Sequence, residues 1–88
     1  MTAQEMIICE YGSSKNFMTP EVLEQEKINE SHAYELSKGT GLSNEPIWGV
    51  SIVKQIGDNK TKRCTELGDC FFSLEDAKEH INNLKSEL

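Results

Sequence analysis

Residues 47–56 (IWGVSIVKQI) constrain the fold most, because they predict a strand with apolar side chains on both faces. Successive side chains of a strand point to opposite faces. One face carries Trp48, Val50, Ile52 and Ile56, and the other carries Ile47, Ser51, Val53 and Gln55. Pro46 marks an edge before this strand, because proline cannot donate a ladder hydrogen bond. A strand of this kind needs cover on both faces.

The residues that follow predict a hairpin. Residues 57–60 (GDNK) are typical of a tight turn, since glycine, aspartate and asparagine tolerate unusual backbone dihedral angles. We expect a return strand at 61–66. Residues 67–69 then form a bulge or a second turn, before 70–72 lead into the next element.

A helix is predicted over residues 74–87, packed across one face of the sheet. Its apolar residues follow a spacing of three and four, which places them on one side of a helix; they are Leu74, Ala77, Ile81, Leu84 and Leu88. Ser73 precedes this stripe and is a natural N-cap. Acidic residues in the first turn and Lys85 in the last interact favourably with the helix dipole.

Two structures compete for residues 20–38. The alternation in 32–37 (HAYELS) favours a third strand after a short helix near 20–28. Thr19 as N-cap, Pro20 at the first helical position and Gly39 as the stop would instead bracket one helix over 20–38. The apolar residues of this stretch do not form a clean stripe, so we favour the helix followed by a strand.

At the N-terminus, residues 6–11 (MIICEY) predict a strand that would complete a four-stranded sheet. Otherwise 1–31 form a mobile acidic arm and 32–88 the core. In either case the chain is one α+β domain over 1–88, a small antiparallel sheet of three or four strands with a C-terminal helix on one face. The second apolar face is then buried by the N-terminal segment or by another molecule.

Composition narrows the functional classes. The chain of 88 residues carries a net charge of −6. It has no apolar run long enough for a transmembrane helix and no basic-then-apolar leader, so we expect a cytoplasmic protein without membrane contact. Three cysteines are too few, and odd in number, for a secreted disulfide scaffold.

Little in the sequence predicts catalysis or a bound metal. Cys9, Cys64, Cys70, His32 and His80 are the only soft metal ligands, and no close cysteine pair of the zinc type is present. Cys64 follows Lys62 and Arg63, which would favour a thiolate, but no general base at a defined distance is evident. We therefore expect a non-enzymatic protein without metal or cofactor.

The leading hypothesis is a protein-interaction or regulatory module, self-associating or bound to a basic partner. Its surface would comprise Trp48, Val50 and Phe71 together with Gly39 and Gly41, whose loop (38–45) allows a close backbone approach. Eight glutamates in residues 1–46 would steer it toward positive charge.

The alternative is nucleic-acid binding through the hairpin 54–63. It gathers four basic residues against Asp58 alone, namely Lys54, Lys60, Lys62 and Arg63. Lysine at a hairpin tip is also an ordinary solvated surface, and an acidic chain repels the phosphate backbone at long range. Nucleic acid is therefore the less favoured partner.

Overall fold

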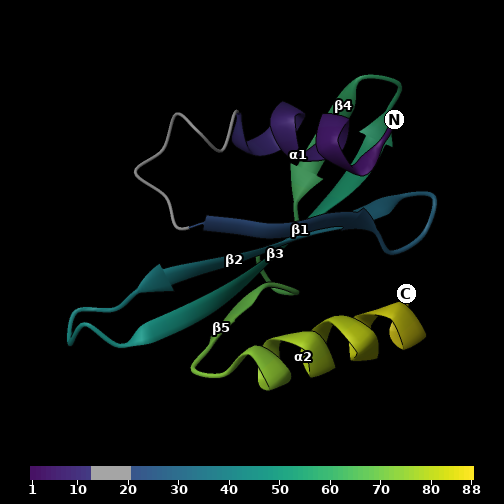
Figure 1. The fold of residues 1–88 in the computed structure, drawn as a ribbon. Coiled ribbons are helices and arrows are strands. Elements are labelled where there is room, and N and C mark those ends of the chain that lie inside the picture. The colour runs from purple at the N-terminus through teal and green to yellow at the C-terminus, as the bar shows by residue number, and fades with distance from the viewer. Residues whose placement is uncertain (13–20) are drawn as a thin grey trace.

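The computed structural model describes residues 1–12 and 21–88 as an antiparallel sheet with a helix on each face (Figure 1). This confirms the α+β class, with five strands in the sheet instead of three or four. In chain order the elements are α1 (Ala3–Tyr11), β1 (Glu21–Lys27), β2 (His32–Thr40), β3 (Pro46–Gly57), β4 (Lys60–Arg63), β5 (Asp69–Phe71) and α2 (Leu74–Glu87).

Strand β3 is the centre of the sheet. Along one edge it pairs with β2, from His32 opposite Lys54 to Thr40 opposite Pro46. Along the other edge it pairs first with β5 and then with β4. The strands predicted at 32–37 and 47–56 and the turn between β3 and β4 are confirmed. The return strand is shorter than predicted, because the chain turns away after Arg63 before β5 begins.

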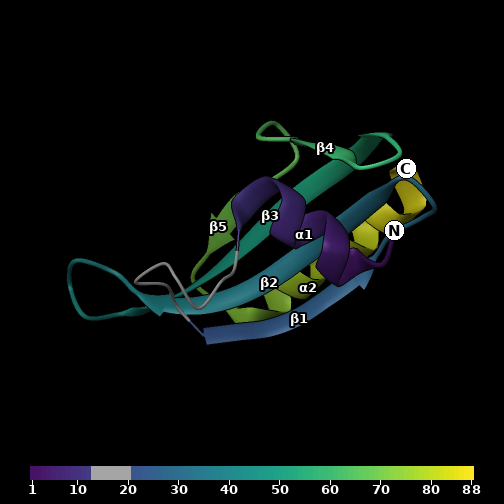
Figure 2. The ribbon, with the colours of Figure 1, turned by 90° about the horizontal axis from the view of Figure 1, so that it is seen from above.

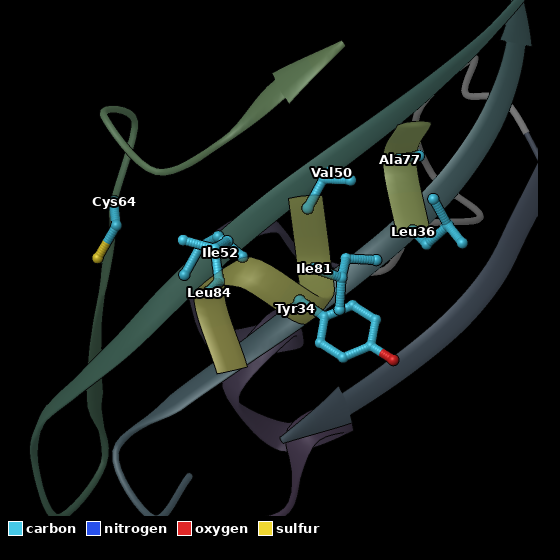
Figure 3. Close-up of a cluster of buried hydrophobic side chains, with 8 residues drawn as sticks. All are labelled: Tyr34, Leu36, Val50, Ile52, Cys64, Ala77, Ile81 and Leu84. Carbon is cyan, nitrogen blue, oxygen red and sulfur yellow. The ribbon is translucent and has the colours of Figure 1, made fainter. Parts of the chain in front are cut away.

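Helix α2 forms as predicted and covers one face of the sheet. The Ser73 hydroxyl accepts a hydrogen bond from the backbone N–H of Asp76 at 3.1 Å, which caps the first turn. In Figure 3, Ala77 lies toward Leu36 and Leu84 toward Ile52, so α2 runs along β3 in the same direction. The buried cluster on this face comprises Tyr34, Leu36, Val50, Ile52, Cys64, Ala77, Ile81 and Leu84.

The strand predicted over residues 6–11 is wrong, because the structure has helix α1 there. Its first turn is held by a capping box. The Thr2 hydroxyl accepts from the backbone N–H of Glu5, and the Glu5 carboxylate accepts from the backbone N–H of Thr2 at 2.8 Å. Ala3, Met6 and Ile7 then fall on one side of the helix, at a spacing of three and four.

This N-terminal helix covers the second apolar face of the sheet (Figure 2). Ala3, Met6 and Ile7 bury themselves with Ala33 of β2 and Val53 of β3. The Thr61 hydroxyl of β4 also donates to the carbonyl oxygen of Met6 at 3.3 Å. Of the two alternatives for burying that face, the N-terminal segment is therefore the one that the structure shows.

Residues 21–27 form strand β1, so both helical predictions, near 20–28 and over 20–38, are wrong; Thr19 and Pro20 lie outside the described residues. Asn29 makes the turn into β2, because its side-chain oxygen accepts from the backbone N–H groups of Ser31 and His32, both at 2.9 Å. On the helix α2 face, the Tyr34 hydroxyl contacts the carboxylates of Glu24 and Glu26 at 3.1 and 3.0 Å. Pairing with β2 thus fixes a strand that its own residues do not favour.

The role of α1 can be tested at two neighbouring isoleucines. Ile7 is 1 % exposed and Ile8 is 48 % exposed. We expect Ile7→Ala to lower the free energy of unfolding by about 2–5 kcal/mol, as core truncations do. Ile8→Ala, the matched control, should change it by less than about 0.5 kcal/mol. Urea denaturation of both variants measures the difference, and equal effects would contradict the packing of α1 on the sheet.

Candidate interaction surfaces

Two of the residues predicted for a binding surface lie together on the helix α2 face. Trp48 of β3 stands opposite Phe71 of β5, and both pack at the margin of the buried cluster while staying partly exposed. The ammonium of Lys38 lies 5.5 Å from the centroid of the Trp48 ring. The Phe71 ring lies 5.1 Å from that of His80. Val50 is only 3 % exposed and drops out of the predicted surface, because it belongs to the core.

Of the aromatic side chains in residues 1–12 and 21–88, the most exposed was not among the predicted site residues. Phe72 is 73 % exposed, and Leu74 at the start of α2 is 36 % exposed. The sequence carried one signal for this, since adjacent phenylalanines in an extended chain point in opposite directions. We call four at least partly exposed apolar residues at and around β5, namely Trp48, Phe71, Phe72 and Leu74, the β5–α2 patch.

Acidic groups border this patch. Asp69 opens β5, and Glu75 and Asp76 occupy the first turn of α2. One Asp69 carboxylate oxygen accepts from the backbone N–H of Cys70 at 2.8 Å. All three acidic residues are exposed, so the border of the patch carries negative charge.

The two predicted glycines lie on the hairpin arm that β2 and β3 form (Figure 1). Gly39 pairs with Ile47, and Gly41 begins the turn. The backbone N–H of Gly41 donates to the carbonyl oxygen of Glu45 at 2.8 Å. A Cβ atom at Gly41 would stand 2.7 Å from the Cδ1 atom of Ile47, so any other residue would require the Ile47 side chain to move aside. Leu42 is fully exposed at the tip.

The basic hairpin does not present its four predicted residues on one face. Lys54 and Lys62 stand opposite each other across β3 and β4. Arg63, one residue further along β4, points to the α1 face, where its guanidinium lies 5.2 Å from the centroid of the Tyr11 ring. Lys60 closes the turn opposite Gly57. These four residues therefore do not form one continuous surface that could contact successive phosphates.

A hollow of about 250 Å³ opens on the β3 edge, where β4 ends and β5 begins. Tyr11, Ser51, Arg63, Asp69 and Cys70 are among its lining residues. Burial raises the pKa of the Tyr11 hydroxyl, and the Arg63 guanidinium acts in the opposite direction. The hollow therefore presents a phenol with a raised pKa beside the side chains of Arg63 and Asp69.

Cys64 also borders this hollow, but its thiol stays protonated. Burial raises the pKa of the Cys64 thiol, and the carboxylate of Glu66 raises it further, against the opposing effect of Lys54 and Lys62. Lys62 therefore acts in the direction expected from the sequence, but burial outweighs it.

The fold and these surfaces define a small α+β domain with a five-stranded antiparallel sheet between two helices. Comparison of the chain with protein-family models, curated proteins and solved structures gives no match. Residues 1–12 and 21–88 contain no group of three or more histidine, cysteine or acidic side chains placed to hold a metal ion. In the same described ranges, neither helix is long and apolar enough to cross a membrane.

His32 makes stability depend on pH in a defined direction. Burial lowers the pKa of its imidazole, and the ammonium of Lys54 lowers it further. The unfolded chain therefore binds more protons than the folded one as the pH falls through about 6.5, so the free energy of unfolding should fall from pH 7.5 to 5.5.

We expect His32→Gln to show a smaller loss of stability than the wild-type chain over this interval, because glutamine does not titrate. Urea denaturation at several pH values measures both slopes, with His80→Gln as the histidine control. An unchanged slope in His32→Gln would contradict this assignment.

Proposed function

We propose that the protein is a non-catalytic interaction module that binds another protein through the β5–α2 patch. The partner would present an apolar segment bordered by basic residues. The observation that carries the proposal is the exposure of Phe72, at 73 %, directly after Phe71 in the chain, where Phe71 and Trp48 form an aromatic pair that is only partly buried. Exposed aromatic clusters are the usual anchors of protein interfaces.

The patch is not a by-product of an incomplete core. Helix α2 covers one face of the sheet and helix α1 covers the other, so Val50, Ile52 and Val53 of β3 already have partners inside the chain. Phe72 lies outside both buried clusters, and the fold gains little from an apolar side chain there. A binding role explains the phenylalanine better than a packing role does.

The surroundings of the patch favour a basic partner. Asp69, Glu75 and Asp76 border it, and opposite charge on a partner would steer the encounter. The Trp48 ring packs against the buried cluster and lies 5.5 Å from the Lys38 ammonium, so its ordering on binding costs less entropy than that of a fully exposed side chain. The exposed Leu42 at the arm tip offers a second apolar contact beyond the patch.

Pairing of two copies through β1 is less favoured. This strand carries Glu21, Glu24 and Glu26 against Lys27, and like charges on an edge strand oppose pairing with an identical strand. Nucleic-acid binding has less support as well, since Arg63 lies on the opposite face from Lys54 and Lys62.

Phe72 provides the direct test of the proposal. We expect immobilised wild-type protein to retain a protein from an extract of its own cells, and Phe72→Ser to lose it, because serine removes the apolar anchor. Ile56→Ser is the matched control, since Ile56 is also exposed, at 57 %, but lies on the β3–β4 hairpin. Thermal unfolding should show that both variants fold like the wild type.

Identical retention by the wild type, Phe72→Ser and Ile56→Ser would contradict binding through this patch. Sedimentation velocity over a range of concentrations distinguishes self-association, which would replace the basic partner by a second copy. A chain that stays monomeric and retains no protein in a Phe72-dependent way would overturn the proposal.

A further inference from the structure

Three basic side chains stand side by side at the opposite end of β3 from the β5–α2 patch. The register places His32 of β2 opposite Lys54 of β3, and Lys54 opposite Lys62 of β4. Directly opposed residues of antiparallel strands share a face of the sheet. His32 is two residues from the buried Tyr34 and Lys54 two residues from the buried Ile52, so the basic row continues the α2 face.

Lys54 and Lys62 repel each other, because like charges directly opposite each other are unfavourable, and a protonated His32 adds to this repulsion. The backbone N–H of Gln55 donates to the carbonyl oxygen of Ser31 at 2.7 Å, which marks His32 and Lys54 as the closely spaced kind of pair. Two acidic residues, Glu26 and Glu30, precede His32 in the chain. The Glu26 carboxylate is hydrogen-bonded by Tyr34, and Glu30 is exposed in the preceding turn.

The turn before β2 also orients the His32 ring. Its Nδ1 atom lies 3.2 Å from the side-chain oxygen of Asn29 and 3.0 Å from the hydroxyl of Ser31. Either tautomer can satisfy these two contacts, since the Ser31 hydroxyl can donate or accept and the Asn29 oxygen accepts. The Nε2 atom lies outside them, and both ring nitrogens are donors once the imidazole takes up a proton.

We propose that His32, Lys54 and Lys62 form a binding site for a small doubly charged oxyanion of the phosphate class. Lys54 and Lys62 supply ammonium donors, and His32 supplies Nε2–H once it is protonated. A dianion removes the repulsion within the row and so favours the imidazolium that Lys54 disfavours in the free protein. The site is separate from the β5–α2 patch and does not depend on the proposed function.

The charges around His32 set the direction of the pH dependence. Lys54 on β3 and Lys62 on β4 face the site, Glu30 lies in its own turn, and Lys85 of α2 lies 5.6 Å over the ring of Tyr34. These are mostly cations, and among them and His32 only histidine has an ordinary pKa, about 6.5, between pH 5.5 and 7.5. Affinity should therefore rise as the pH falls, opposite to the stability of the free protein.

The net charge of −6 favours a small free anion over a long polyanion as the ligand, because the repulsion grows with the charge of the ligand. Phosphate groups of a nucleic-acid strand have the same chemistry, but the glutamates of the chain would repel their neighbours along the strand. A comparison of a small anion with an oligonucleotide at constant ionic strength distinguishes the two sources.

Titration with sulfate, followed by nuclear magnetic resonance of the backbone amides, tests the site. Sulfate keeps two charges from pH 5.5 to 7.5, so a pH effect reports on the protein. We expect saturable shifts around residues 31–33 and 53–55, with tighter binding at pH 5.5. Lys54→Ala should weaken binding about tenfold, the loss expected for one charge-assisted hydrogen bond. Lys27→Ala, whose lysine pairs with Ala33 on the other face, should leave the affinity unchanged.

His32→Gln should bind sulfate with the same affinity at both pH values, and inorganic phosphate at pH 7.5 should shift the same amides. Absence of saturable shifts, an equal loss in Lys27→Ala and Lys54→Ala, or a persisting pH effect in His32→Gln would overturn the proposal. Binding of a ten-residue oligothymidylate without binding of sulfate or phosphate would overturn it too, in favour of a nucleic-acid surface.

Discussion

The need of strand β3 for cover on both faces determines the whole arrangement. Val50 and Ile52 point to one side of the sheet and Val53 to the other, and each side has its own buried cluster. A sheet covered by α2 alone would expose Val53 and Ala33 to water, at a cost of roughly 1.5–3 kcal/mol for the valine side chain alone. Helix α1 removes this cost, and Thr61 ties it to β4 through the Met6 carbonyl oxygen.

The sequence predicted the elements whose own residues determine their structure. Helix α2 has a cap and a stripe of the right period, and β3 is rich in β-branched residues. The two N-terminal elements were exchanged, with a strand predicted for α1 and a helix for β1. A short apolar run such as residues 6–8 fits either a helix or a strand by periodicity. The signal in the sequence that favours a helix is the capping pair of Thr2 and Glu5. Strand β1 is set by its pairing with β2, which no local pattern records.

The candidate surfaces likewise include residues that the sequence predicted and residues that only the structure reveals. Trp48 and Phe71 were recognisable as aromatic residues near a sheet edge, but whether a given side chain is buried depends on what packs over it. Val50 is buried under α2, while Phe72 lies outside the buried cluster and is exposed. The row of His32, Lys54 and Lys62 comes from three strands, so it could be seen only once their register was known.

Both surfaces depend on one register along β3. Trp48 and Lys54 are six residues apart and so share the α2 face, with the acidic first turn of α2 near one end and the basic row at the other. A slip of one residue between β2 and β3 would carry both side chains to the α1 face and bring Ile47 and Val53 under α2. The burial of Val50, Ile52 and Val53 opposes that slip. The core that makes the fold stable thereby also keeps an apolar patch and a cationic row at opposite ends of one strand, far enough apart for each to be occupied without the other.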